Sequence, residues 1–360
     1  MFFILTMEQK YGKINKIIVL LGVQMKRLLG VFLTIIFILL MVAALIVVAV
    51  SAIDWFSYSS FYTHANKVFL IPGINEGYIP QGFEYDAETD KYLLSGYMSD
   101  ERASRIYVVE DSGESTCVEL KNEDGSDYMG ESGGIAHYGE YIYISSSKGL
   151  DVFSYTDIKN GAEEVCRLGT LLTYNEPEYC TIYNGYLFVG SFYELGEEDV
   201  LEHEYNVTPS GEVNPAIITV FQLDDEAEFY VDPTPKAVIT TTAMVQGMCF
   251  TDKNEIILST SFGLSPSKLY IYDTSELSED PSFTTFSGTC NGQEFSFEGV
   301  KKYHLESKNI KETIKAPPMA EEIFYKDGKI FMMNESAGNK YIFGKFTTGL
   351  YTYSYAYRAA

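Results

Sequence analysis

The amino-acid sequence predicts an all-β domain, a β-propeller of five blades with six as the alternative, preceded by one N-terminal transmembrane helix. Two observations support this prediction. A long apolar segment without charged residues lies near the N-terminus, at residues 28–53. Beyond it, short runs of Tyr, Phe, Ile and Val alternate with turns rich in Gly, Asp and Asn. Such alternation is typical of β-strands joined by tight turns. A two-sheet β-sandwich is the competing architecture.

The segment at residues 28–53 has the length and composition of a membrane-spanning helix. It includes no charged side chain, and as a helix it would extend about 39 Å, more than the roughly 30 Å of bilayer hydrocarbon. Five basic residues precede it and Asp54 follows it. Because basic flanks stay in the cytoplasm, we expect a single-pass cell-membrane protein whose C-terminal domain is extracytoplasmic.

A cleaved secretory signal is the alternative, because Ala49 and Ser51 provide small residues suited to cleavage. The apolar core is longer than that of a typical signal, which favours a retained signal-anchor. The sequence then divides into a cytoplasmic tail, a transmembrane anchor, a stalk and a propeller domain, at residues 1–27, 28–53, 54–65 and 66–360.

The part of the chain beyond the anchor is strongly acidic. The whole sequence holds 26 basic and 50 acidic residues, of which five and two, respectively, lie within residues 1–54. Residues 55–360 therefore carry 21 basic and 48 acidic residues, a net charge near −27. Such a surface repels phosphate backbones, which excludes nucleic acid as a partner and favours a neutral, cationic or metal-bridged one.

Five cysteines lie beyond the anchor, an odd number whose spacing matches no zinc site. Some of them sit in apolar runs, which favours small buried hydrophobic residues on strands, with one disulfide as the alternative. The segments that begin at Asn206 and Asn334 match the N-glycosylation sequon, which has meaning only in a eukaryotic secretory pathway.

The apolar runs form a repeat that occurs five times. Each repeat has a small or acidic start, an apolar strand, a tight turn, a second strand and then a third. Asn184-Gly185 and Asp327-Gly328 supply the positive φ angles that two-residue hairpins need. Fourth strands are expected at TCVEL, EEVCRLGTLLT, KAVITTT and NIKETIKAP. Four antiparallel strands in each repeated unit is the composition of a propeller.

The last repeat ends at Tyr355 without a fourth strand, whereas residues 66–73 (NKVFLIPG) form an isolated strand before the first repeat. We predict that this strand completes the last blade and closes the ring, which removes exposed sheet edges. Uneven spacing between the repeats predicts insertions at residues 194–214 and 278–300. The alternative sixth blade would lie within residues 276–310.

Polar residues begin the inner strand of each repeat. Alignment on the hairpins gives five equivalent positions and two acidic neighbours: Gln81, Ser132, Glu178, Gln246 and Glu321, with Glu131 and Glu322 adjacent. Since inner strands surround a propeller's channel, we expect these side chains to converge at one mouth and bind a ligand. Their oxygens suit Ca²⁺ or a polyhydroxyl molecule. Converging carboxylates also suit acid/base catalysis. Alternatively, these residues line the channel and bind only water.

Three other motifs receive plainer interpretations. GESGG at residues 130–134 fits G-x-S-x-G, but a strand follows where a hydrolase has a helix, so we expect a turn that leads into a strand. DAETD at residues 86–90 lacks the Gly and distal Glu of a calcium loop and is expected to be a hairpin turn. The acidic EED at residues 197–199 is expected on a solvated rim loop.

Two short motifs, IPQG at residues 79–82 and VQG at residues 245–247, resemble those of bacterial membrane-anchored extracytoplasmic β-propellers of unassigned function. Residues 66–355 are also distantly similar to lactonase-like and strictosidine-synthase-like propellers. That resemblance implies a metal held at the channel mouth by acidic and Asn side chains. Here Glu178 and Glu321 offer carboxylates, while glutamines stand at two other positions. Five-bladed propellers also include glycosidases that use three channel carboxylates.

The leading functional hypothesis is a membrane-tethered binding module for a small molecule, glycan or protein ligand. The alternative is a metal-dependent or carboxylate-driven hydrolase of lactones, esters or glycans. A purely structural envelope protein is the third hypothesis. No motif decides whether the chain is an enzyme.

Overall fold

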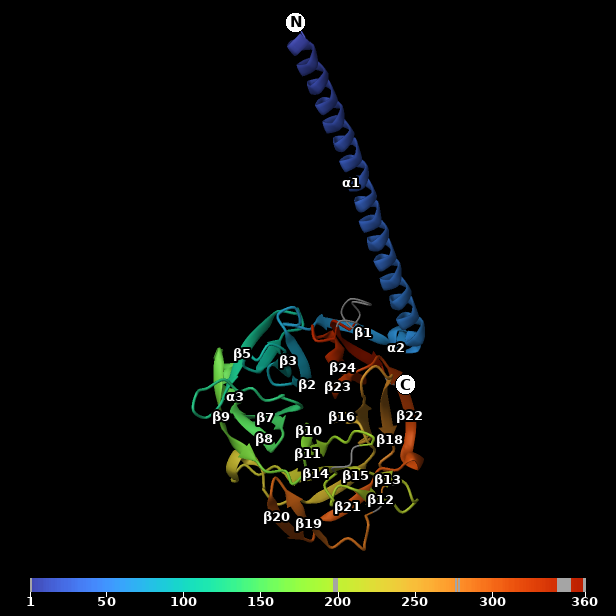
Figure 1. Ribbon diagram of the computed structural model, residues 1–360. Coiled ribbons are helices and arrows are strands. Elements are labelled where there is room, and N and C mark those ends of the chain that lie inside the picture. Colours follow the sequence, from blue (N-terminus) through green and yellow to red (C-terminus); the bar gives the residue numbers. More distant parts are fainter. Residues whose placement is uncertain (1, 197–199, 276, 278, 342–350, 359–360) are drawn as a thin grey trace. The chain divides into compact units, whose positions relative to one another are not determined.

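The computed structural model of the protein describes residues 2–196, 200–275, 277, 279–341 and 351–358 (Figure 1). The chain divides into two compact units, Met1–Asp54 and Trp55–Ala360. The first unit is helical, and the second contains all the described strands.

Helix α1 (Phe2–Ser57) contains the apolar segment that the sequence singled out. Its portion Ile18–Ser57 is long and apolar enough to cross a membrane, and apolar side chains along it, such as Phe32 and Leu40, are exposed. A signal sequence near the N-terminus would have the same properties. The helix extends beyond residues 28–53 in both directions because no proline interrupts residues 2–57.

Twenty of the 25 described strands of the second unit form five groups of four, arranged around a centre (Figure 1). Within each group, here called a blade, neighbouring strands pair antiparallel. The first strands of neighbouring blades contact one another around the centre. The predicted all-β propeller behind one long apolar helix is therefore confirmed.

The blades take their strands in chain order, except that the first strand of the unit joins the last blade. Blade 1 contains β2 (Tyr78–Asp86), β3 (Lys91–Met98), β4 (Arg105–Val109) and β5 (Ser115–Lys121). Blade 2 contains β6 (Ile135–Tyr138), β7 (Tyr141–Ser146), β8 (Gly149–Ser154) and β9 (Glu164–Leu171). Blade 3 contains β10 (Pro177–Tyr183), β11 (Tyr186–Ser191), β14 (Ala216–Gln222) and β15 (Ala237–Thr241). Blade 4 contains β16 (Val245–Phe250), β17 (Ile256–Thr260), β18 (Ser267–Tyr272) and β22 (Ile310–Ala316). Blade 5 contains β23 (Ala320–Lys326), β24 (Lys329–Asn334), β25 (Tyr353–Arg358) and β1 (Ala65–Leu70).

The four predicted fourth strands are confirmed as β5, β9, β15 and β22. Outer strands also join across blades, since β5 pairs parallel with β9 and merges blades 1 and 2 into one eight-stranded sheet. Short helices lie in the connections: α3 (Tyr155–Lys159), η1 (Glu228–Tyr230), η2 (Ser307–Asn309) and η3 (Glu335–Ala337).

Strand β1 closes the ring, as the sequence predicted. It pairs antiparallel with β25, with Asn66 opposite Ala356 and Lys67 opposite Tyr355. The residues just before it, predicted as part of a stalk, form helix α2 (Ser59–His64), which packs on blade 5. There the buried ring of Phe61 stacks on Tyr357, with ring centroids 5.3 Å apart. Residues 59–64 of the predicted stalk therefore form a helix that packs on the propeller domain.

Aromatic rings fill the interface between blades 5 and 1. Phe83 of β2 meets Phe324 of β23 edge to face, with centroids 4.8 Å apart, and Phe324 stacks on Phe331 of β24 at 4.6 Å. Phe69 of β1 lies against both Phe83 and Tyr92. Rings paired in these geometries add to the stabilisation from their buried area. The abundance of Tyr and Phe in the sequence thus reflects packing between blades.

The two predicted insertions form small elements, the first between two strands of blade 3 and the second between two strands of blade 4. The first contains the hairpin of β12 (Asn206–Val207) and β13 (Val213–Asn214), while residues 197–199 of the expected acidic rim loop lie outside the described residues. The second contains the hairpin of β19 (Thr285–Cys290) and β20 (Gln293–Glu298), followed by β21 (Lys301–His304). Because β21 pairs parallel with β15 of blade 3, the described part of residues 276–310 supplies no sixth four-stranded sheet.

The five cysteines are free thiols on five different strands, so the alternative of a disulfide is not realised. Cys180, Cys249 and Cys290 are buried, as expected of small hydrophobic residues. Cys117 is half-buried and Cys166 is exposed, which departs from that expectation because both lie on the outer strands β5 and β9.

We predict that closure by β1 contributes strongly to stability. Substitution Phe69→Ala removes a ring that is 4% exposed and should lower the free energy of unfolding by about 3–5 kcal/mol. Leu70→Ala is the matched control on the opposite face of the same strand, where the side chain is 50% exposed and the expected loss is below about 0.5 kcal/mol. Urea unfolding of the full chain in detergent, followed by far-UV circular dichroism, measures both. Equal losses would contradict the closing role.

Candidate functional site

Four of the five inner strands are interrupted by an irregularity in register at the same point. The irregularities lie between Pro80 and Phe83, Pro177 and Tyr179, Val245 and Gly247, and Ala320 and Ile323. They contain the predicted site residues Gln81, Glu178, Gln246 and Glu321. An irregularity of this kind, a β-bulge, takes a residue out of the alternation and re-aims its side chain. The bulges therefore mark one end of the channel, here called the mouth.

Below the mouth, Glu322 connects four blades through hydrogen bonds. Its Oε2 accepts the backbone N–H groups of Phe83 and Ile135, each at 2.8 Å, and its Oε1 accepts that of Cys180 at 3.2 Å. The side chain projects from blade 5, and the three donors belong to blades 1, 2 and 3. Burial raises the pKa of Glu322, and these three donors oppose that shift. Glu322 is a structural residue of the channel centre, although the sequence placed it among the ligand-binding residues.

Glycines allow the inner strands to approach Glu322 this closely. A Cβ atom on Gly134 would lie 2.5 Å from Glu322 Oε1, and one on Gly247 would lie 2.6 Å from Glu322 Cα. Real Cβ atoms do not approach other atoms at such distances. Glycine is therefore needed at these positions of the inner strands, because a larger residue would collide with Glu322.

Blade 2 departs from the predicted alignment. Phe83 and Ile135 bind the same oxygen of Glu322, so the residue two positions before Ile135, Gly133, corresponds to Gln81. Ser132 is fully buried with a φ of 51°, and its Oγ lies 3.5 Å from the carbonyl oxygen of Gly130. Ser132 thus belongs to the turn that leads into β6, which confirms the interpretation of GESGG as a turn and moves Ser132 away from the predicted ring.

Four carboxylates gather at the mouth, those of Glu131, Glu178, Glu321 and Glu335, here called the mouth cluster. Burial, followed by the charges of Glu131 and Glu335, raises the pKa of Glu178 to about 7. Burial, followed by the charges of the other three, raises the pKa of Glu321. Glu131, Glu178 and Glu321, which the sequence singled out, are therefore close enough to act on one another electrostatically.

Glu335 is a member that the sequence did not reveal as a site residue. It follows β24 in helix η3, and its Oε1 accepts hydrogen bonds from the hydroxyls of Tyr341 at 2.7 Å and Tyr97 at 3.2 Å. Lys340 Nζ in turn lies 2.7 Å from the Tyr97 hydroxyl. Burial raises the pKa of Glu335. In the sequence it stood inside a glycosylation motif, at the end of a second strand, where the repeat gave no signal of a function.

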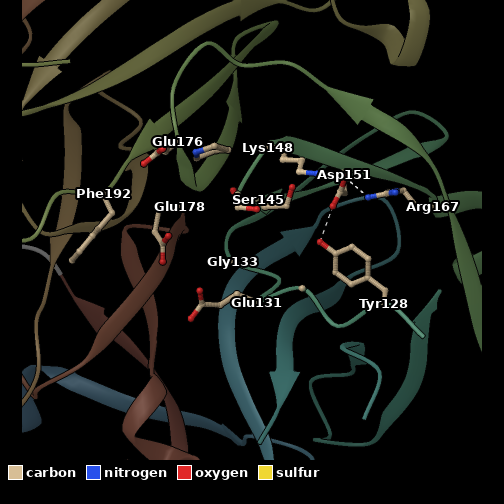
Figure 2. A pocket seen from close by; sticks show the side chains of 14 residues that line it. Tyr128, Glu131, Gly133, Ser145, Lys148, Asp151, Arg167, Glu176, Glu178 and Phe192 are labelled. Atoms are coloured by element: carbon tan, nitrogen blue, oxygen red, sulfur yellow. Dashed lines mark hydrogen bonds and ion pairs between the residues drawn. The ribbon is translucent and has the colours of Figure 1, made fainter. Parts of the chain in front are cut away.

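A pocket of about 670 Å³ opens beside the mouth cluster, between blades 2 and 3. Figure 2 shows the carboxylates of Glu131 and Glu178 pointing toward one another on one side of this mouth pocket. On the other side, Asp151 accepts hydrogen bonds from the Tyr128 hydroxyl at 2.7 Å and from Arg167 at 3.2 Å (Figure 2). The walls also contain Phe192 and three consecutive serines, residues 145–147. The pocket thus offers charged, hydroxyl and aromatic groups together.

Several polar atoms near the mouth are buried without a hydrogen-bond partner among the described residues. Gln81 is 6% exposed and its Nε2 makes no hydrogen bond, and the same holds for Oε1 of the half-buried Gln246. Ser145, which is 2% exposed and lines the mouth pocket, has an unpartnered Oγ. Because a buried polar atom without a partner costs free energy, such atoms indicate a place where a polar molecule binds.

A second charged cluster lies where the inner strands of blades 1 and 2 end. His137 Nδ1 lies 2.8 Å from Glu84 Oε2, and His137 Nε2 lies 3.3 Å from Asp86 Oδ1. Burial disfavours the charged imidazole, but the two carboxylates outweigh this effect and raise the pKa of His137 to about 10. Asp86 also accepts a hydrogen bond from Thr89, within the predicted turn at residues 86–90. The imidazole of His137 from blade 2 contacts both carboxyl groups of blade 1, so this cluster joins two blades.

No group of three or more His, Cys, Asp or Glu side chains within the described part of the chain is arranged to hold a metal ion. The assignment of Ca²⁺ to Glu178 and Glu321 therefore stays a prediction. Glu178, Glu131 and the neighbouring hydroxyls have the hard oxygens that would contact such an ion.

Comparison with known proteins returns distant structural likenesses. No family model matches the chain, and no curated protein matches it. The PQQ-bound form of aldose sugar dehydrogenase from Streptomyces coelicolor is 13% identical over 81% of this chain and 95% of that chain, with a TM-score of 0.40. Glutaminyl cyclase from Myxococcus xanthus is 11% identical over 82% of this chain and 95% of that chain, with a TM-score of 0.41. The fold assignment rests on the strand pairing described above.

The adjacent residues Glu321 and Glu322 should respond in opposite ways to the same substitution. Glu322→Gln places an amide donor against backbone donors and should lower the free energy of unfolding by about 3 kcal/mol. Glu321→Gln removes a buried charge whose side chain makes no hydrogen bond with a described residue, and should leave stability unchanged or raise it. Urea unfolding at neutral pH compares the two. A larger loss for Glu321→Gln would contradict the assignment.

The stability that depends on Glu178 should fall as pH rises. Its pKa is about 7 in the folded protein and near 4.3 in an unfolded chain, so folding is favoured below the lower value and the advantage is lost as pH rises through 7. Glu178→Gln should therefore match the parent at pH 4.5 and be more stable by about 1–2 kcal/mol at pH 8. The exposed Glu226→Gln is the control. A pH-independent difference would refute the shift.

Proposed function

We propose that the chain is a membrane-tethered binding module whose mouth pocket takes a small polyhydroxylated molecule or a glycan. Helix α1 would anchor the chain in the cell membrane, with the propeller on the extracytoplasmic side. The observation that carries this proposal is the pocket of about 670 Å³, where carboxylates, serine hydroxyls and a phenyl ring lie together. That volume is in the range of sites for small organic ligands.

The chemistry of the pocket walls supports a ligand rich in hydroxyl groups. Carboxylates such as those of Glu131 and Glu178 accept hydrogen bonds, and the serine hydroxyls both donate and accept. Phe192 offers an aromatic face for the apolar side of a sugar ring. Asp151 is already oriented by Tyr128 and Arg167, so it presents a fixed acceptor array. Fixed groups lose little entropy on binding.

The alternative, a carboxylate-driven hydrolase, is favoured by one observation. Glu178, with a pKa raised to about 7, shares the pocket with the exposed Glu131. Two carboxyl groups in different environments can divide the roles of proton donor and ionised partner. In that reading Glu178 protonates the leaving group of a glycan, ester or lactone. For the binding module, the proposal also includes a protein ligand at the mouth. For the hydrolase, it also includes Ca²⁺ at Glu178 and Glu321.

The aromatic wall provides a test of binding. We expect a panel of neutral and amino mono- and disaccharides to contain a molecule that raises the melting temperature of the full chain in detergent. Phe192→Ala should weaken that binding about two- to tenfold, the value of one aromatic contact. Tyr186→Ala removes an exposed ring outside the pocket and should leave affinity unchanged. Binding that survives Phe192→Ala undiminished, or no binding at all, would contradict the proposal.

Measurement of substrate turnover distinguishes the hydrolase from the binding module. A hydrolase should cleave a member of a panel of lactones, esters and glycosides, and Glu178→Gln should remove that activity while the protein stays folded. Binding without turnover in the parent chain would support the binding module alone.

A further inference from the structure

Three of the four carboxylates of the mouth cluster have no cationic partner among the described residues. The side chains of Glu131, Glu178 and Glu321 make no ion pair or hydrogen bond with any residue in the described ranges, although ion pairs are common elsewhere on the domain. Glu335 has a nearby ammonium, that of Lys340, which is itself hydrogen-bonded to Tyr97. Lys148 and Arg167 also line the mouth pocket, where Arg167 pairs with Asp151. The partial or complete desolvation of Glu178 and Glu321 is therefore not offset by an ion pair with any described residue.

An independent observation places a ligand next to this unpaired charge. Ser145 lines the same pocket as Glu131 and Glu178, is 2% exposed, and has an Oγ without a hydrogen-bond partner among the described residues. A hydroxyl in that position is satisfied when a polar group enters the pocket. A ligand with both a hydrogen-bonding group and a positive charge would therefore complement Ser145, Glu131 and Glu178 in this pocket.

The rim of the pocket adds an aromatic surface. Phe192, in the pocket wall, lies beside Phe262 with ring centroids 6.4 Å apart, and Phe262 is 43% exposed. Aromatic faces attract cations and also contact the apolar faces of sugars. The field of a domain with a net charge near −27 further raises the local concentration of cations.

We propose that the ligand of the mouth pocket carries a protonated amine, which pairs with Glu178 and Glu131, on a hydroxylated body that contacts Phe192 and Ser145. This inference rests on the proposed function and specifies the chemistry of its ligand. Glu178 is the residue that decides between an amine and a neutral group, because it is both half-buried and unpaired. A charge-assisted hydrogen bond to it is stronger than a neutral one.

Two forms of one sugar test the charge without changing the skeleton. The probes are the β-1,4-linked disaccharide of glucosamine and its di-N-acetylated counterpart, measured by calorimetry on the full chain in detergent near pH 7. We expect the amine form to bind at least about tenfold more tightly than the acetylated form. Glu178→Gln should remove this preference, whereas Glu226→Gln, an exposed acid outside the pocket, should preserve it.

The outcomes distinguish this inference from the function on which it rests. Equal affinity for the two sugars, or an amine preference that persists in Glu178→Gln, would overturn the inference and leave the binding module intact. Binding of neither sugar would overturn the inference, and the failure of the whole saccharide panel would also remove the function. Since Glu178→Gln relieves a buried charge, loss of folding does not confuse the result; melting temperatures verify this.

Discussion

The three hydrogen bonds that Glu322 accepts hold the centre of this propeller together. A carboxylate at such depth would be costly if it were left unpaired, and here each interaction comes from a backbone N–H of a different blade. Such bonds to a charged group are stronger than those between neutral groups. They also require inner strands that carry glycine where Gly134 and Gly247 lie, because any side chain there would collide with Glu322. At Glu322, the glycines of the sequence, the close packing of the inner strands and the hydrogen bonds to the carboxyl group therefore depend on one another.

The residue next to Glu322 on the same strand belongs to the group of acidic side chains at the mouth. Glu321 is the neighbouring residue in the bulge of β23, and it lies near Glu178, Glu131 and Glu335 without an ion-pair partner among the described residues. Glu322 thus stabilises the fold, whereas the unpaired carboxyl group of the adjacent Glu321 destabilises it. Sites of binding and catalysis commonly carry such unfavourable local electrostatics, because a ligand then relieves them. Two neighbouring glutamates of one strand consequently serve stability and recognition separately.

The strands and the ring closure could be predicted because their signals are local. Apolar alternation and the Asn184-Gly185 and Asp327-Gly328 turns identify hairpins, and a missing fourth strand after β25 requires a partner such as β1. The predicted residues Gln81, Glu178, Gln246 and Glu321 lie in equivalent bulges of their strands, and their role in binding stays a prediction. No local pattern reports the register of blade 2, the position of Glu335 or the pairing of His137 with Glu84. These features depend on contacts between different blades.

The pairing of β1 with β25 also has a consequence for the order in which the molecule is made. Ribosomes synthesise β1 early in the domain, after helices α1 and α2, and β25 after the other strands. During synthesis the edge of β1 stays unpaired while four blades form. The ring therefore locks only when the last strand arrives, and a chain cut short before β25 would present an open sheet edge, a form that cells can recognise and degrade.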